Sequence, residues 1–411
     1  MATQELVVQL EPEHYDNLTD ANAVGKTNFG KSSCQNNTGT VFAVGSDDNV
    51  VVYTSNSYAT KYATSISNPG NSNSLFGFKI AMDSPGDTII IGAPGDNRVY
   101  VFDAQNQART SWTQRSSGWS GNSYLGTSSS VNYGADVDVA GDDDSLFVVG
   151  RPGDHKIELW SWPNGSSATL LKTITKSSYF GFSCKLSADG QVVIAGGPGN
   201  YYPSGTSNAY GNGIAHVYAK DPSSASTWTE RTLPFDYTDC PNFVFFYDQK
   251  TTSVKRVTNT FAFDGGSMTL LYPAFGYSVA INKDGTFIAV SAPNRRCFFS
   301  AEWKNDTYYN WLTGKPVTGE IDSFGSYLFM QYDGTRIVTG NTDIEDKVWW
   351  NSDASFPRWT DLDTSGKSYC VLDWNGLYYT NYSESFNQYS FGGVPTSMSR
   401  NGEFTLFSTK Y

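Results

Sequence analysis

One short pattern recurs along this chain and restricts what the chain can fold into. A Phe-Gly or Tyr-Gly pair opens a run of alternating apolar residues, a turn follows, and a second apolar run ends in Gly-Ala-Pro or a variant of it. Clear copies start at Phe76, Tyr133, Phe180 and Phe275, and weaker copies start at Phe29, Phe324 and Phe391. Repetition at this spacing is typical of folds in which similar units stack against their neighbours.

Each copy predicts an antiparallel unit of four strands. The first run alternates, so that Phe182, Cys184 and Leu186 fall on one face of a strand. Turns such as Asp189-Gly190 supply the positive φ that a tight hairpin needs. The second run, such as residues 192–194, is continuously apolar, which predicts burial on both faces. An amphipathic third strand and a fourth strand rich in Trp and Thr complete the unit.

These units predict an all-β fold, a seven-bladed β-propeller of four-stranded antiparallel blades. A single unit cannot bury both faces of its sheet, and a closed ring of units also removes exposed sheet edges. The seventh unit ends after its second strand, whereas residues 6–10 form an apolar run that belongs to no unit. We therefore expect one domain, residues 1–411, closed by pairing of the N- and C-terminal strands.

Two intervals between the Phe-Gly pairs are too long for one blade. The interval from Phe180 to Phe275 spans 95 residues, the interval from Phe324 to Phe391 spans 67, and both contain additional strand-like runs. We interpret these runs as inserted segments at about 235–274 and 361–390. In the alternative, one of them is a degenerate eighth blade that lacks its Phe-Gly strand.

The Phe-Gly opening, the Gly-Ala-Pro of residues 92–94 and the aromatic third strand resemble the FG-GAP repeats of integrin α-subunit propellers. The resemblance covers nearly the whole chain and implies the propeller fold. Integrin-type repeats often carry a calcium loop of several aspartates between the first two strands. Most of these loops are shortened here. The third unit retains a calcium candidate, Asp138, Asp142 and Asp144 with the neighbouring Asp143, for which a solvated acidic turn is the alternative, and no other cofactor is expected.

Composition excludes several classes of function. With 28 basic and 40 acidic side chains the net charge is −12, which argues against nucleic acid as a partner because a phosphate backbone requires a basic surface. No apolar run approaches the length of about 18 residues that spans a membrane, so membrane insertion is not expected. Five scattered cysteines predict neither a zinc site nor a disulfide framework, and the common nucleophile, metalloprotease and phosphate-loop motifs are absent.

The topology of such a meander predicts where a ligand binds. Links from second to third strands, and from each fourth strand to the next blade, meet on one side of the disc, and the long segments of the chain collect there. Aromatic side chains in those segments can stack on sugar rings or anchor a protein interface, or they pack among themselves to order the loops. The candidate ligand-binding residues are Tyr201, Tyr202, Tyr210, Phe235 and Tyr237.

We therefore predict a recognition or structural module without catalytic activity, which binds a protein or a glycan on a cell or particle surface through its loop-rich face. FG-GAP-like repeats are typical of extracellular adhesion proteins, yet the first residues show no signal-peptide pattern. Display on a virion surface is one hypothesis that joins these observations, and a cytoplasmic location is its alternative. The competing class of function is a carbohydrate-active enzyme, a glycosidase or lyase with paired carboxylates at the propeller channel.

Overall fold

Nearly all regular structure in this protein is β. The computed structural model describes residues 30, 32–46, 48–56, 59–115, 132–199, 211–240, 243–248, 253–258, 260–263, 266–269, 273–295, 297–309, 317–318, 325–340, 369–374, 379–381, 393–398 and 405–409. Within these ranges the helical segments are short 3₁₀ turns, η2 (Pro152–Asp154), η3 (Tyr237–Asp239) and η4 (Pro293–Arg295). The described part of the chain therefore contains no helix with the length and apolar character needed to cross a bilayer.

Six sheets repeat one arrangement, in which four strands follow in chain order and each is antiparallel to the next. The first two sheets comprise β1 (Ser32–Gln35), β2 (Val41–Gly45), β3 (Asn49–Asn56) and β4 (Ala59–Ser67), then β5 (Lys79–Met82), β6 (Thr88–Ala93), β7 (Arg98–Ala104) and β8 (Trp112–Gln114). The third and fourth comprise β9 (Val137–Val139), β10 (Leu146–Arg151), β11 (Lys156–Ser161) and β12 (Thr169–Thr175), then β13 (Ser183–Leu186), β14 (Val192–Gly197), β15 (Ile214–Asp221) and β16 (Ser224–Arg231).

The remaining sheets follow the same order with small additions. The fifth comprises β21 (Val279–Ile281), β22 (Phe287–Ala292), β23 (Cys297–Lys304) and β24 (Thr307–Tyr309), and β25 (Val317–Thr318) also pairs with β23. The sixth comprises β26 (Tyr327–Met330), β27 (Arg336–Gly340), β28 (Tyr369–Trp374) and β29 (Tyr379–Asn381). The last two strands, β30 (Gly393–Met398) and β31 (Thr405–Thr409), form a two-stranded sheet.

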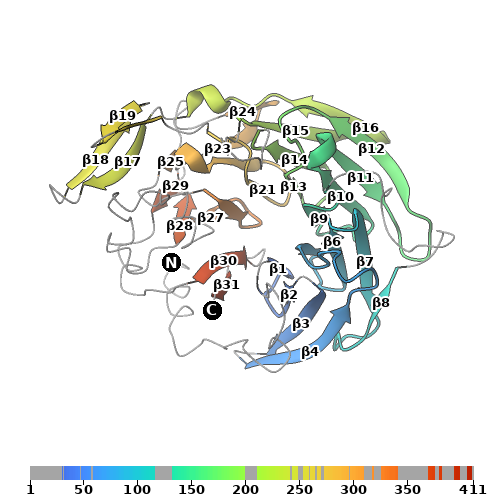
Figure 1. The fold of residues 1–411 in the computed structure, drawn as a ribbon. Coiled ribbons are helices and arrows are strands. Elements are labelled where there is room, and N and C mark those ends of the chain that lie inside the picture. The colour runs from blue at the N-terminus through green and yellow to red at the C-terminus, as the bar shows by residue number, and fades with distance from the viewer. Residues whose placement is uncertain are drawn as a thin grey trace.

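The sheets are blades of a closed β-propeller (Figure 1). The first strand of each blade lies innermost, and these strands contact one another in the order β1, β5, β9, β13, β21, β26 and β30. Strand β30 in turn contacts β1, so the ring returns to its start. Seven innermost strands therefore complete the ring among the described residues. The expected pairing of residues 6–10 with the last blade lies outside them.

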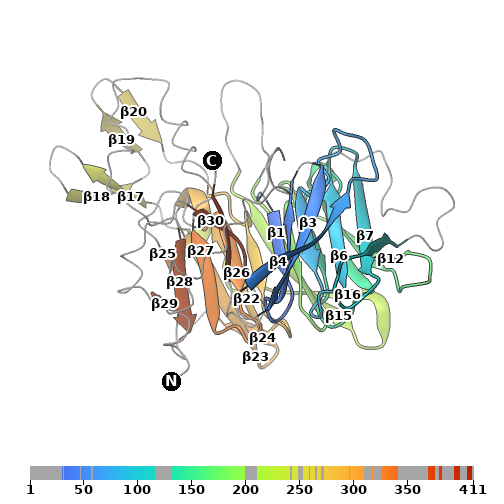
Figure 2. The ribbon, with the colours of Figure 1, turned by 90° about the horizontal axis from the view of Figure 1, so that it is seen from below.

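The segment predicted as an insertion at 235–274 contains two hairpins. Strands β17 (Phe243–Asp248) and β18 (Ser253–Thr258) pair only with each other, as do β19 (Thr260–Phe263) and β20 (Gly266–Thr269). Figure 2 shows both hairpins projecting beyond the blades. Neither supplies an innermost strand to the ring.

The interpretation of 361–390 as an insertion needs correction. Strand β28 pairs with β27 from Gly340 and Tyr369 to Arg336 and Asp373, and β29 continues the sheet, so this segment supplies the third and fourth strands of the sixth blade. The extra length lies instead between the second and third strands, at residues 341–368. A third strand that starts so far from its hairpin is hard to assign to it from the sequence.

The repeated Phe and Gly positions are explained by contacts within and between blades. Phe76, Phe180 and Phe275 are fully or almost fully buried, so each anchors its blade in the core. Gly181 has φ of +91° and donates its backbone N–H to the carbonyl oxygen of Gly196 within the fourth blade, at 3.0 Å. Its own carbonyl oxygen lies only 2.0 Å from where a Cβ on Gly150 would stand. The second-strand glycine of one blade thus makes room for the Phe-Gly turn of the next.

Candidate functional site

The innermost strands are joined around the propeller axis by side chains of one repeat position. In the first, third, fourth and fifth blades the residue two positions after the Phe-Gly or Tyr-Gly glycine is Ser or Asp, and its side chain accepts a hydrogen bond from the backbone N–H of the next innermost strand. The pairs are Ser32 with Ile80 at 3.0 Å, Asp136 with Cys184 at 2.8 Å, Ser183 with Val279 at 3.2 Å and Ser278 with Leu328 at 2.9 Å. These bonds satisfy edge donors that would otherwise face the axis.

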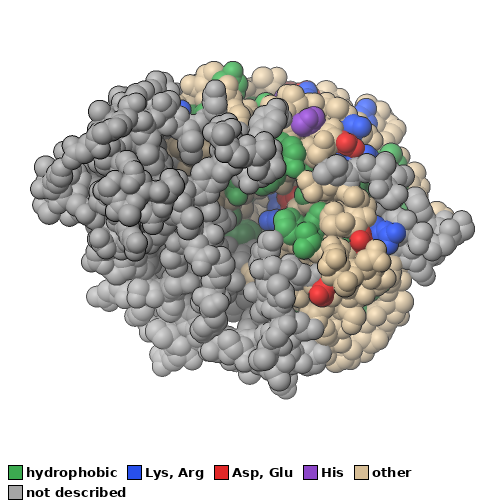
Figure 3. All heavy atoms as spheres, viewed as in Figure 1, with side chains coloured by type: hydrophobic (Ala, Val, Ile, Leu, Met, Phe, Trp, Pro, Cys, Tyr) green, Lys and Arg blue, Asp and Glu red, His purple; other side chains and the backbone are tan. Residues whose placement is uncertain are grey.

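Two buried carboxylates lie at β9: Asp136 directly precedes this strand, and Asp138 lies within it. Besides the bond to Cys184, Asp136 lies 3.7 Å from the Lys185 ammonium, and Asp138 accepts the Leu186 N–H at 2.9 Å. Burial opposes the charge of Lys185, but the two carboxylates outweigh it and raise the pKa of this ammonium. In Figure 3 a few acidic and basic side chains are scattered over the described part of this face. Both carboxylates thus hold β13 in place, which differs from the acid–base pair that the glycosidase alternative requires.

On one side of the disc the blades are linked by their backbones. We call this the turn side and define it by the links between first and second strands, residues 36–40, 83–87, 140–145, 187–191, 282–286 and 331–335. Backbone hydrogen bonds pass from each such link to the next, through Asn37 to Ser84, Ser84 to Gly141, Asp142 to Ala188, Asp189 to Lys283 and Lys283 to Tyr332, at 2.8 to 3.1 Å. This side therefore offers tight, mutually bonded turns.

The three aspartates of the calcium candidate do not gather around one point. Asp138 accepts from β13, Asp142 accepts from the Ser84 hydroxyl at 3.2 Å, and Asp144 lies 3.4 Å from the buried Arg115 guanidinium. In the described part of the chain no three His, Cys, Asp or Glu side chains come together as metal ligands. The carboxylates of Asp138, Asp142 and Asp144 each contact a residue of a neighbouring blade.

Of the candidate aromatic residues, Tyr201, Tyr202 and Tyr210 lie outside the described residues. Phe235 is only 4% exposed and packs in the core of the fourth and fifth blades, with its ring centroid 5.0 Å from that of Phe299. The prediction that Phe235 contacts a ligand therefore needs correction, because burial leaves its ring no surface for one.

Tyr237 has the opposite environment. It is 37% exposed and opens η3. Asp236 caps this turn, since its carboxylate accepts the Thr238 N–H at 2.7 Å while its own N–H donates to Asp239 at 2.8 Å. The ring is thus presented to solvent on an ordered turn, and it remains a candidate contact.

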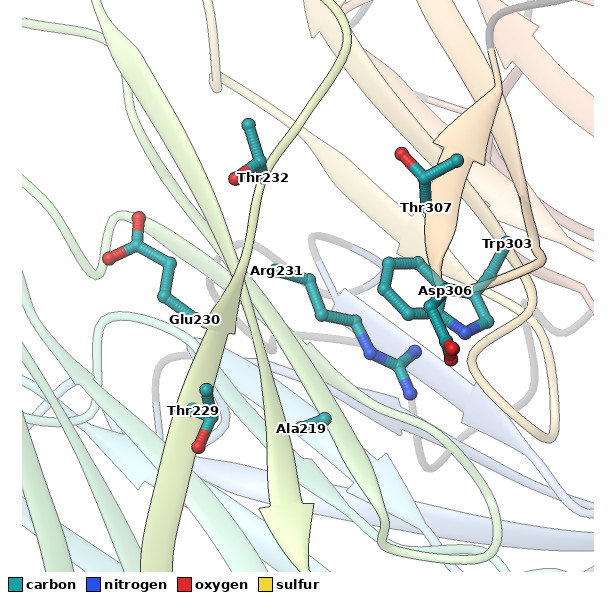
Figure 4. A pocket seen from close by; sticks show the side chains of 8 residues that line it. All are labelled: Ala219, Thr229, Glu230, Arg231, Thr232, Trp303, Asp306 and Thr307. Carbon is teal, nitrogen blue, oxygen red and sulfur yellow. The ribbon is translucent and has the colours of Figure 1, made fainter.

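The structure also contains a groove that the sequence did not indicate. It lies between β16 of the fourth blade and the β23–β24 hairpin of the fifth, and its volume is about 380 Å³. In Figure 4 the Arg231 side chain extends from β16 toward Trp303 on β23. The guanidinium carbon lies 4.0 Å from the centroid of the indole. The lining residues are Ala219, Thr229, Glu230, Arg231, Thr232, Trp303, Asp306 and Thr307.

Trp303 and Arg231 are held by their neighbours. The Trp303 ring meets the buried Tyr308 ring edge to face at 4.8 Å, and the Tyr308 hydroxyl donates to the Gly285 carbonyl at 2.9 Å. Burial raises the pKa of Tyr308 to about 12, although a hydrogen bond from Arg231 opposes this. The turn at Asn305 and Asp306, both with positive φ, places the Asp306 carboxylate at the mouth of the groove.

Glu230 interacts with Lys176 and His216 rather than with Arg231. Its carboxylate oxygens lie 2.8 Å from the Lys176 ammonium and 2.5 Å from His216 Nδ1. Partial burial opposes ionisation, but the hydrogen bonds with Lys176 and His216 outweigh it and lower the pKa of Glu230. Figure 4 shows its side chain turned away from Arg231. Arg231 is therefore the positive charge beside the indole, and an aromatic face, a guanidinium, hydroxyls and one carboxylate are available for non-covalent recognition.

No known family profile matches the sequence, and no curated protein matches it. Among solved structures, a Lactobacillus plantarum protein is similar at 11% identity and a TM-score of 0.46, over 85% of this chain and 83% of that one. The Cps50 (Swd1) β-propeller domain of Myceliophteria thermophila follows at 7% identity and 0.45, over 77% and 81%. Kuenenia stuttgartiensis hydrazine synthase is similar at 13% identity and 0.42, over 75% and 79%. The fold assignment rests on the sheets themselves.

Proposed function

We propose that this protein is a recognition module without catalytic activity, which binds a protein partner in the groove between β16 and the β23–β24 hairpin. The observation that carries the proposal is the stacking of Arg231 on Trp303, in a recess open to solvent. Tryptophan and arginine are the residues most often responsible for binding energy at protein interfaces, especially where a recess shields them from water.

The chemistry of the groove favours a partner segment that carries a carboxylate. A guanidinium stacked on a ring keeps its edge N–H groups in the plane, where they can donate to a carboxylate. Asp306 and the hydroxyls of Thr229, Thr232 and Thr307 supply further polar contacts around it. Exposed Tyr237 lies on the segment that follows β16, and we include it as a further candidate contact.

The experiment compares two variants with two controls. Trp303→Ala and Arg231→Gln remove the ring and the charge, whereas Trp112→Ala and Arg109→Gln make the same changes on the second blade, at a half-buried Trp and an ion-paired Arg. A partner is identified by cross-linking in the native source, and its Kd is measured with purified components. We expect losses of about 30-fold or more for the groove variants, the range of an interface hot spot, and none for the controls.

Three results would contradict the proposal. A partner bound equally well by Trp303→Ala and Arg231→Gln would place the interface elsewhere. A glycan array on which the native protein binds sugars, and loses them with Trp303→Ala, would make a glycan the ligand of the groove. Hydrolysis of any glycoside in a substrate panel by the native protein would contradict the proposal that the module has no catalytic activity.

The surface of a cell or of a virus particle is the setting we propose for this binding. The support is the resemblance of the repeats to those of adhesion proteins. Antibody labelling of intact cells and purified particles tests it, because a protein confined to the cytosolic fraction would remain unlabelled in both.

A further inference from the structure

Two thiols from different blades lie side by side on the loop side of the fourth and fifth blades. Cys240 directly follows η3, and Cys297 opens β23. They are 57 positions apart, yet both are buried in one core cluster and lie close enough for each thiol to affect the charge of the other, while the Cys297 thiol donates to the Ala292 carbonyl at 3.8 Å. The other described cysteine side chains, Cys34 and Cys184, belong to two different clusters.

A charged group accompanies the pair. Arg295, at the end of η4, is only 9% exposed, and its Nε and Nη1 atoms have no hydrogen-bond partner among the residues that the structure describes. A buried guanidinium without a partner is costly, and a redox role or a negative charge that forms in one state of the site can explain it. Burial lowers the pKa of Arg295, and the thiols of Cys240 and Cys297 are the groups that oppose this shift.

We propose that Cys240 and Cys297 are an oxidisable pair that hydrogen peroxide converts to a disulfide, with Arg295 positioned to stabilise the thiolate that starts the reaction. Peroxide is small and uncharged, which suits a buried site. The thiolate attacks one peroxide oxygen, the O–O bond breaks, and a sulfenic acid forms while the leaving hydroxide takes up a proton as water. The second thiol then attacks that sulfur, and the S–S bond forms as a second water leaves.

The two thiols have different tasks in this sequence. Burial raises the pKa of Cys297, and its thiol proton is directed to the Ala292 carbonyl oxygen at 3.8 Å, so we assign the second attack to Cys297. Cys240 is the first nucleophile. The resulting bond would tie the start of the segment that carries β17–β20 to the fifth blade, and so fix the base of both hairpins.

The test uses the full chain treated with hydrogen peroxide, then unfolded and alkylated. We expect the intact mass to fall by two hydrogen atoms before alkylation, and after it we expect a cross-linked peptide that joins Cys240 to Cys297 and full alkylation of Cys34 and Cys184. Arg295→Gln should slow disulfide formation about tenfold, the effect of roughly one pKa unit on the thiolate, and Arg295→Lys should restore most of the rate.

Several outcomes would overturn the inference. Complete alkylation of Cys240 and Cys297 after peroxide would show that the pair does not close. A disulfide from either of them to Cys34, Cys184 or Cys370 would show that another geometry governs the chemistry. An unchanged rate in Arg295→Gln would remove the role assigned to the guanidinium, and an equally fast loss of the Cys297 thiol to a disulfide in Cys240→Ser would show that Cys240 is not its partner.

Discussion

The phenolic oxygen of Tyr332 lies 2.6 Å from the hydroxyl oxygen of Ser84, although 248 positions separate the two residues. Ser84 belongs to the first link of the second blade and Tyr332 to that of the sixth, so Tyr332 reaches over the propeller axis. Its hydroxyl also donates to the Asp142 carboxylate at 3.1 Å, and Ser84 donates to the same oxygen at 3.2 Å. Three blades are thus joined by side chains on the turn side.

Replacing Tyr332 by Phe should lower the free energy of unfolding by about 1 kcal/mol, since the net value of such hydrogen bonds is modest. Denaturant titration measures the change. The double variant Ser84→Ala, Tyr332→Phe should lose less free energy of unfolding than the two single variants lose in sum, because the two hydroxyls share one network. Strict additivity would show that the contact across the axis contributes nothing.

The raised pKa of Asp83 should make the free energy of unfolding depend on pH. Burial raises the pKa of its carboxyl from 3.8 to about 6, although the backbone N–H groups of Thr88, Asp87 and Gly86 oppose the shift. Between these two values the folded state keeps a proton that the unfolded state has lost. The free energy of unfolding therefore falls as pH rises through this window, by on the order of 1 to 3 kcal/mol in total.

Asp83→Asn should remove this dependence and leave the protein more stable than the native chain above pH 6, the upper end of the window. Asparagine fits the position, since Asn36 and Asn282 make the equivalent bonds to Val41 at 3.1 Å and to Phe287 at 2.8 Å. Urea titrations of both proteins over a pH series measure the difference. A difference that does not change with pH would contradict the raised pKa.

Gly150→Ala should be among the most damaging substitutions in the chain. The new Cβ would stand 2.0 Å from the Gly181 carbonyl oxygen, so the third and fourth blades would have to separate. We expect a loss of about 3 kcal/mol or more. Gly165→Ala is the matched control, because no atom lies within 4 Å of its Cβ and only its φ of +79° opposes the change. Equal melting temperatures for the two variants would count against the close approach.

Substitutions at Asp136 test the hydrogen bonds that join neighbouring innermost strands. Asp136→Ala leaves the Cys184 N–H without its acceptor, and we expect a loss of about 1 to 3 kcal/mol. Asp136→Ser should lose less, because Ser183 fills the same repeat position and accepts from Val279. Chemical unfolding compares the two. If both variants were equally destabilised, the acceptor at this position would not be what joins the blades.

The fold was largely predictable because its signals are local. The Phe-Gly positive φ, the Asp-Gly and Asn-Gly turns and the buried second strands each act within about 20 residues, and seven copies reinforce one another. The sixth blade departs from this rule, since residues 341–368 separate its second and third strands. Pairing over such a distance leaves no periodic signal, so the sequence alone favours an insertion at 361–390 over the third and fourth strands of this blade.

The candidate site was much less predictable. Phe235 stands in a polar stretch typical of an exposed loop, and its burial depends on Phe275 and Phe299, which belong to the next blade. Arg231 and Trp303 likewise come from different blades and meet only where those blades stack. The nearest local signal was the Arg that ends the Trp-Thr strand at residues 228–231, and nothing in it indicated a tryptophan as its partner.

The chain of backbone bonds on the turn side limits how this architecture can change. Every first link of the six four-stranded blades has five or six residues, and each donates to or accepts from a neighbour. These bonds keep the links within one residue of each other in length, whereas links on the opposite side span ranges such as 198–213 and 232–278. Insertions, whether they arise in evolution or as engineered peptide grafts, should therefore be tolerated on the side of the disc opposite the turn side.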